Sequence, residues 1–129
     1  MSFDTLKALL ESAQVDQRSA IISLFDELLT RDAVVQHLIF YPNKLDVTID
    51  FQFPENRVSV TNVKKAAKRL NGMFGSISST RGGQAGVRYE IDLTQEIDEI
   101  DTKKIVYSLT KNYPNALDKR WGARIENKF

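Results

Sequence analysis

The sequence predicts a single α+β domain, residues 1–129, in which a helical segment, residues 1–42, precedes a βαββαβ unit, residues 43–129. Three observations support this prediction. Apolar residues recur at helical spacing in the first part of the chain, several later stretches alternate between apolar and polar residues, and two helix-like stretches separate those strands. A chain of 129 residues without cysteine can bury a core without disulfides or thiolate metal sites.

The N-terminal segment is expected to be helical throughout. Ser2 or Asp4 can cap a first helix through about Ala13, and Asp16 can cap a second. The second helix carries a wide apolar arc that continues as a third helical turn ending before Pro42: Ile21, Ile22, Leu24, Phe25, Leu28 and Leu29, then Val34, Val35, Leu38, Ile39 and Phe40. We expect this arc to pack under the sheet as core, with a homodimer face through the N-terminal helices as the alternative.

The βαββαβ unit is assembled from four strands and two helices. The strands are Leu45 to Phe53, which alternates most clearly, a stretch within Met73 to Thr80, Val87 to Leu93, and Ala123 to Phe129. The helices are Thr61 to about Gly72, with Thr61 as N-cap, and Thr102 to about Asn112, with Asp101 as N-cap. This order is that of a ferredoxin-like sandwich with a four-stranded antiparallel sheet, in which the strands starting at Leu45 and Val87 are central neighbours.

Charge is distributed in blocks that a formal net charge of +1 conceals. Residues 57–88 carry +7 with no acid, whereas residues 1–55 carry −5, residues 89–101 carry −6 and residues 102–129 carry +5. Such segregation indicates separate acidic and basic surfaces.

The basic block contains the strongest candidate site. At helical spacing, four cations lie opposite Val63, Ala66, Ala67 and Leu70, and no acid accompanies them as it would on an ordinary solvated face, which remains the alternative. A Gly-rich hairpin loop, Arg81 to Gly86, and a second basic cluster around Trp121 add to it. The candidate nucleic-acid-binding residues are Lys64, Lys65, Lys68, Arg69, Arg81, Arg88, Lys119, Arg120 and Trp121.

These residues predict a small non-enzymatic regulator or accessory protein that contacts the phosphates of DNA or RNA. The alternative is a protein-interaction module, an inhibitor or adaptor, whose basic surface meets an acidic protein partner. The two differ in salt dependence, because phosphate binding weakens steeply with salt.

An enzymatic alternative rests on Asp46, Asp50, Glu90 and Asp92, which would share the open sheet face. Four such carboxylates could hold divalent cations for nucleotidyl transfer or nuclease chemistry. Alternating polar residues are also what a solvated sheet face requires, and we adopt that interpretation: no enzyme, no metal and no cofactor. The single histidine, His37, is interpreted as a packing or surface residue.

The N-terminus carries Asp4 where a secretory signal would be basic, and no apolar run approaches the ~20 residues that span a bilayer. The expectation is a soluble, cytoplasmic protein with no membrane partner.

Overall fold

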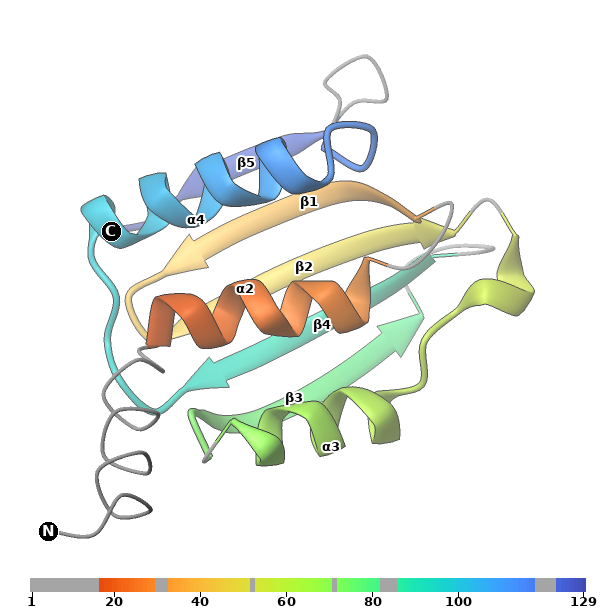
Figure 1. The fold of residues 1–129 in the computed structure, drawn as a ribbon, viewed down its shortest axis with the longest axis horizontal. Coiled ribbons are helices and arrows are strands. Elements are labelled where there is room, and N and C mark those ends of the chain that lie inside the picture. The colour runs from red at the N-terminus through yellow and green to blue at the C-terminus, as the bar shows by residue number, and fades with distance from the viewer. Residues whose placement is uncertain (1–16, 30–32, 52, 71, 82–85, 118–122) are drawn as a thin grey trace, which may run out of the picture.

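The computed structural model describes residues 17–29, 33–51, 53–70, 72–81, 86–117 and 123–129, without the side chains of Pro54 and Arg81. In this part of the chain the fold is α+β, with helices over a five-stranded mixed sheet (Figure 1). The elements are α2 (Gln17–Leu28), β1 (Ala33–Tyr41), β2 (Lys44–Phe51), the 3-10 turn η1 (Pro54–Asn56), α3 (Val60–Arg69), β3 (Phe74–Arg81), β4 (Gly86–Leu93), α4 (Glu99–Asn112) and β5 (Arg124–Asn127). The expected first helix lies outside the described residues.

The sheet differs from the predicted four-stranded antiparallel one. Its strand order is β3-β4-β2-β1-β5, and all neighbours are antiparallel except β1 and β5, which are parallel. The elements from β2 to β5 follow the predicted order, and β2 and β4 are neighbours as expected. The added strand β1 lies between β2 and β5, so the last strand pairs with β1 instead of β2.

The prediction of a third helical turn before Pro42 is wrong, because residues 33–41 form β1. Its apolar alternation is interrupted by a bulge between Val35 and His37, where one residue of β1 has no opposite partner on β2. Val35, Leu38 and Phe40 are therefore all fully buried although they are three and two residues apart. That spacing imitates a helix, while the β-branched and aromatic composition is typical of a strand.

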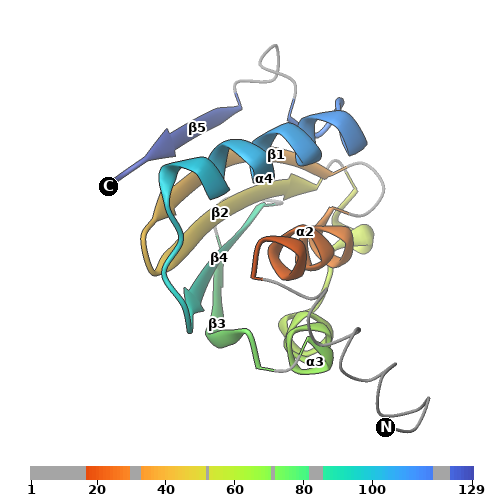
Figure 2. The same cartoon turned by 60° about the vertical axis from the view of Figure 1, so that its left-hand side comes forward.

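All three described helices lie on the same face of the sheet, with α2 between α3 and α4 (Figures 1 and 2). The core fills the layer between helices and sheet, and its largest fully buried side chains include Phe25, Phe40, Phe51 and Tyr89. Ile21, Leu24 and Leu28 of α2 are also fully buried, which accounts for the apolar arc of this helix. The opposite sheet face carries no described helix and is mostly polar.

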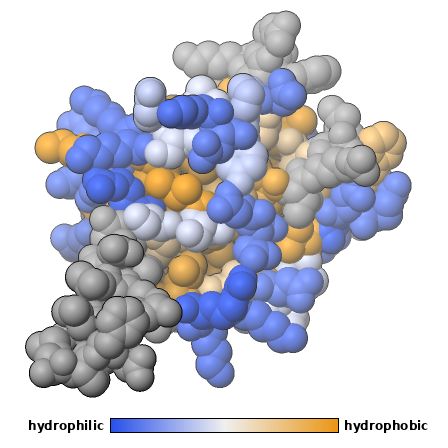
Figure 3. Space-filling view, viewed as in Figure 1, coloured by the Kyte–Doolittle hydropathy of each residue, from blue (hydrophilic) through white to orange (hydrophobic). Residues whose placement is uncertain are grey.

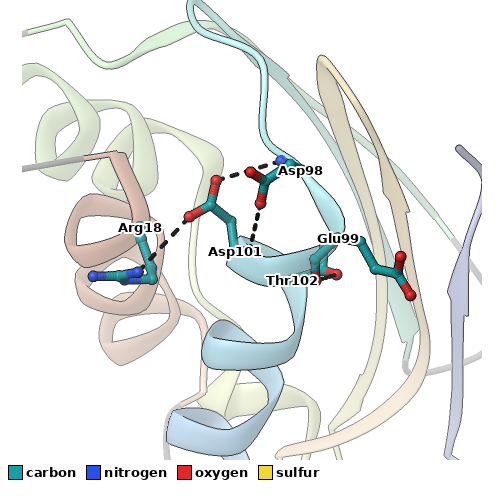
Figure 4. Close-up of polar contacts among 5 residues, drawn as sticks. All are labelled: Arg18, Asp98, Glu99, Asp101 and Thr102. Atoms are coloured by element: carbon teal, nitrogen blue, oxygen red, sulfur yellow. Dashed lines mark hydrogen bonds and ion pairs between the residues drawn. The ribbon is translucent and has the colours of Figure 1, made fainter.

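Polar contacts fix α2 against the segment that leads into α4. The Gln17 side chain is buried, and its Nε2 donates to the Gln95 carbonyl at 2.7 Å while its Oε1 accepts from the Gln95 N–H at 3.1 Å. The sequence predicts Asp101 as the N-cap of α4, but the structure shows that the N-cap is Asp98. Asp98 accepts from the Asp101 N–H at 2.8 Å, and Asp101 completes the capping box while lying 3.8 Å from Arg18 (Figure 4).

No helix within the described residues combines the length and apolar character needed to cross a bilayer.

The Tyr89 hydroxyl provides a test of how the connection before α3 is held to the sheet. This fully buried side chain donates to the Val58 carbonyl at 2.8 Å. Tyr89→Phe should lower the free energy of unfolding by about 1 kcal/mol, since the carbonyl loses its donor while the ring still fills the core. Urea denaturation measures this as a lower midpoint at an unchanged m-value. Tyr107→Phe is the control, because Tyr107 is 69% exposed, and an equal loss there would contradict the assignment.

Candidate nucleic-acid interface

Helix α3 carries the basic face that the sequence predicted. It begins after Ser59, whose Oγ accepts from the Asn62 N–H at 3.2 Å; Ser59 and not Thr61 is therefore the N-cap. Val63, Ala66 and Ala67 are buried against the rest of the molecule. Beyond the C-cap at Leu70, Gly72 has φ +68°, which a glycine adopts without strain as the chain turns into β3.

The cations of α3 differ in how they are engaged. Lys64, Lys65 and Lys68 are exposed, and none forms an ion pair with a described acidic residue. Arg69 is 70% exposed and its Nη2 lies 2.8 Å from Oε1 of Glu27, on α2. We use "α3 lysine face" for the three lysines. Among the described residues, no carboxylate offsets the charge of these three lysines.

A hollow lies on the α2 side of the α3 lysine face. It has a volume of about 630 Å³ and is lined by Glu27, Arg57, Val58, Ser59, Asn62, Lys65 and Arg69. Arg57 therefore lies near the first turn of α3, in the same hollow as Lys65 and Arg69. Arg57 belongs to the basic block of residues 57–88 but was not predicted as a site residue, because only the path of the chain after η1 brings it there.

A second hollow lies on the other side of α3, against the edge strand β3. Its volume is about 380 Å³, and its lining consists of Lys64, Ala67, Lys68, Gly72, Phe74, Gly75, Ser76 and Ile77. The lysines at 64 and 68, one helical turn apart, thus stand over the sheet edge. In the space-filling view, hydrophilic surface covers the region of α3 (Figure 3).

Arg88, which the sequence placed in the same site, belongs to a different surface. It lies on β4, on the sheet face that carries no described helix, and its Nε donates to Oδ1 of Asp46 at 2.9 Å. Its Nη2 also lies 2.9 Å from Oε1 of Glu90. Two carboxylates therefore neutralise this cation, and it does not extend the α3 lysine face.

Four other candidates cannot be placed. The side chain of Arg81 and all of Lys119, Arg120 and Trp121 lie outside the described residues, as does the loop segment 82–85. Whether they adjoin the α3 lysine face stays a prediction.

The acidic residues of the open face are divided among separate partners. Asp46 and Glu90, opposite each other on β2 and β4, share Arg88, whereas Asp92 accepts from the Ser76 hydroxyl at 2.6 Å. Within the described ranges, no group of three or more His, Cys, Asp or Glu side chains is placed to hold a metal ion. Asp46 and Glu90 thus meet a cation on this face, whereas Asp50 forms no ion pair with a described residue.

Strand β1 adds His37 and Tyr41 to this face, which the sequence did not predict. His37 and Tyr41 lie in the register opposite Thr48 and Lys44, and Lys44 Nζ is 4.7 Å from the centroid of the Tyr41 ring. Their position depends on the strand that had been read as a helix.

Comparison of the chain with protein-family models, with curated proteins and with solved structures gave no match in any of the three.

The Arg88–Asp46 pair predicts an acid-sensitive contribution to stability. The Asp46 side chain is only 7% exposed, and the hydrogen bond from Arg88 lowers the pKa of Asp46 while burial opposes that shift. Because the pKa is lower in the folded state, the stabilisation is complete above the unfolded value, about pH 4, and is lost as the pH falls through the folded pKa. Asp46→Asn should therefore be less stable than the wild type at neutral pH, with a difference that shrinks below about pH 4.

Urea denaturation at a series of pH values measures that difference. Asp50→Asn is the matched control, because Asp50 lies on the same strand and face but forms no ion pair with a described residue. A difference for Asp46→Asn that stays constant down to acid pH would contradict the role of this pair.

Proposed function

We propose that this protein is a small non-enzymatic nucleic-acid-binding regulator or accessory protein that contacts phosphates through α3. The observation that carries the proposal is the α3 lysine face: Lys64, Lys65 and Lys68 are exposed on one helix, without an ion pair to any described acid. A lysine-rich face with no internal counter-charge attracts a polyanion, and binding releases the condensed counterions of the nucleic acid.

The surroundings of the lysines support a phosphate backbone as their ligand. Arg57 and the first turn of α3 share the hollow with Lys65, so guanidinium and ammonium groups lie beside a helix N-terminus. Both groups and the helix end favour negative charge. Such contacts position a nucleic acid without reading its sequence, and we therefore propose binding with little base specificity.

The open sheet face is assigned no part in binding. Base stacking on a sheet requires aromatic side chains at its centre, whereas this face carries Asp46, Thr48, Arg88 and Glu90 there. The ion pairs of Arg88 also remove the one central cation from use. We propose no chemistry at this face, because three of its carboxylates, Asp46, Glu90 and Asp92, are already engaged by Arg88 or Ser76.

Salt dependence tests the proposal directly. With three lysines meeting phosphates, log affinity should fall with log salt at a slope of roughly −2 for single strands to −3 for duplex. The triple variant Lys64→Gln, Lys65→Gln, Lys68→Gln should flatten that slope by most of its value, since glutamine keeps nearly the same helix propensity and removes the charge. Fluorescence anisotropy with labelled DNA and RNA over a range of salt concentrations gives the slope.

The control is the matched triple variant Lys103→Gln, Lys104→Gln, Lys111→Gln, which removes three exposed lysines from α4. It should change the slope much less. Wild-type protein that retains neither DNA nor RNA at ~50 mM salt, where even non-specific binders are favoured, would refute the nucleic-acid function.

A second candidate function is recognition of an acidic protein segment, and the hollow beside β3 favours it. Strand β3 ends the sheet, and no described strand pairs with its outer edge. The Leu93 N–H donates to the Asn43 carbonyl, so Asp92, Glu90 and Arg88 direct their backbone groups toward β3. Ile77 and Ser79 must then direct theirs outward, where an extended segment could add as a strand beneath Lys64 and Lys68.

Ser79→Pro separates the two candidates. Proline removes an outward backbone donor of an edge strand but none of the lysines, and edge positions tolerate it. Under the second candidate, the variant should lose binding to an extended peptide alternating glutamate and valine, measured by fluorescence polarisation, while its nucleic-acid binding is unchanged. Peptide binding equal to that of the wild type would dismiss strand addition at β3.

A further inference from the structure

The outer edge of β5 is the second open edge of the sheet. β5 pairs with β1 alone among the described strands, and Lys128 donates its N–H to the Phe40 carbonyl at 2.8 Å. Successive residues of a strand direct their backbone groups to opposite sides. Asn127 and Ile125, one and three positions before Lys128, therefore direct their N–H and C=O groups away from β1, into the open edge.

Apolar surface accompanies this edge. Two hollows of about 340 and 760 Å³ lie between α4 and β5, and Val106 and Ile125 line both of them. The large apolar side chains exposed by more than a third are, within the described residues, Phe53, Ile100, Tyr107 and Phe129; the last three belong to α4 and to the chain just past β5. Figures 1 and 2 show β5 running beside α4, with the chain end next to the start of that helix.

The charges on β5 complement those of an antiparallel copy of the same strand. Arg124 and Glu126 lie on the same sheet face, 2.8 Å apart, and Arg124 is 67% exposed. When two copies pair antiparallel with Ile125 opposite Ile125, each Arg124 comes to lie opposite Glu126 of the second copy. The two adjacent registers that still match the outward backbone groups place Arg124 opposite Arg124, or Glu126 opposite Glu126, and like charges in such positions are unfavourable.

We propose that two copies of this chain associate through β5, antiparallel about Ile125, to form one continuous ten-stranded sheet. The two-fold axis is perpendicular to the sheet, so the helices of both copies lie on the same face and the two α4 helices flank the seam. Ile125 of one copy forms a hydrogen-bonded pair with Ile125 of the second copy. The apolar side chains of both α4 helices pack over this pair. The lysines of α3 lie at the opposite edge of each sheet and take no part in the contact.

Sedimentation velocity on nuclease-treated protein tests the association. The wild type should sediment as a species of twice the 14.7 kDa chain mass, with a concentration-dependent monomer fraction. Arg124→Glu and Glu126→Arg should each raise the dissociation constant by about tenfold or more, because each replaces two attractive cross-strand pairs by two repulsive ones. The double variant Arg124→Glu, Glu126→Arg restores opposite charges in the same register and should recover the dimer.

Two further variants make the test specific. Asn127→Pro removes an outward backbone donor that forms no hydrogen bond with a described residue, and it should weaken the dimer without altering the monomer's circular dichroism. Glu55→Lys reverses an exposed charge on η1, remote from β5, and should leave the dissociation constant unchanged.

Three results would overturn the proposal. A wild type that stays monomeric at ~100 μM lacks even a weak self-association. Dimerisation that ignores the single charge reversals does not use β5, and a double variant that fails to recover the dimer does not use this register.

Discussion

The bulge in β1 is the constraint on which the arrangement of the sheet depends. By inserting one unpaired residue between Val35 and His37, it changes which residues of the strand face the helices, so that Val35, Leu38 and Phe40 all enter the core. Val34 lies opposite Asp50, on the open face of the sheet. Without the bulge, Leu38 and Phe40 would lie on that same face, because they are four and six residues after Val34. β5 pairs with His37 to Phe40, the residues of β1 that follow the bulge, so the sheet face on which each β5 side chain lies also follows from it.

The two faces of the molecule use charge differently. On the open sheet face, cations and carboxylates alternate across strands and pair with one another, as Arg88 does with Asp46 and Glu90. On α3, Arg69 pairs with Glu27 of α2, whereas the three lysines form no ion pair with any acid in the part of the chain that the structure describes. A net charge of only +1 therefore conceals two different surfaces, an open sheet face on which Arg88 is neutralised and a helix face with three lysines that no described carboxylate pairs.

The sequence was sufficient for the elements whose pattern is local. Alternation predicted β2 and β4, the apolar stripe predicted α3, and Pro114 predicted the end of α4. The order of these elements predicted that β2 and β4 are neighbours. The prediction failed for β1, because the bulge places buried residues three positions apart, at Val35 and Leu38, and this spacing is also found on the apolar face of a helix. It also failed for the partner of β5, since strand order is set by packing between distant segments. The helix caps shifted by two or three residues, from Thr61 to Ser59 and from Asp101 to Asp98, because several adjacent polar residues can cap.

The site was predictable to a similar degree. Helical periodicity identified the exposed lysines of α3, but it could not show that Arg88 is bound by Asp46, a residue 42 positions away. Nor could it bring Arg57 next to Lys65, because that contact depends on the turn at η1. Contacts within one helix follow from spacing, whereas those between elements require the fold.

The parallel pairing of β1 with β5 also favours one order of folding. His37 meets Arg124, 87 positions later, whereas the β1–β2 hairpin closes over a two-residue turn between Tyr41 and Lys44. Loop-closure entropy makes the long pairing late and the hairpin early. Until β5 pairs with β1, the backbone edge of β1 at Leu38 and Phe40 is unpaired and lies next to an incomplete core. A nascent chain released before residue 124 would keep that edge, a β-rich apolar template for aggregation and a surface that chaperones bind.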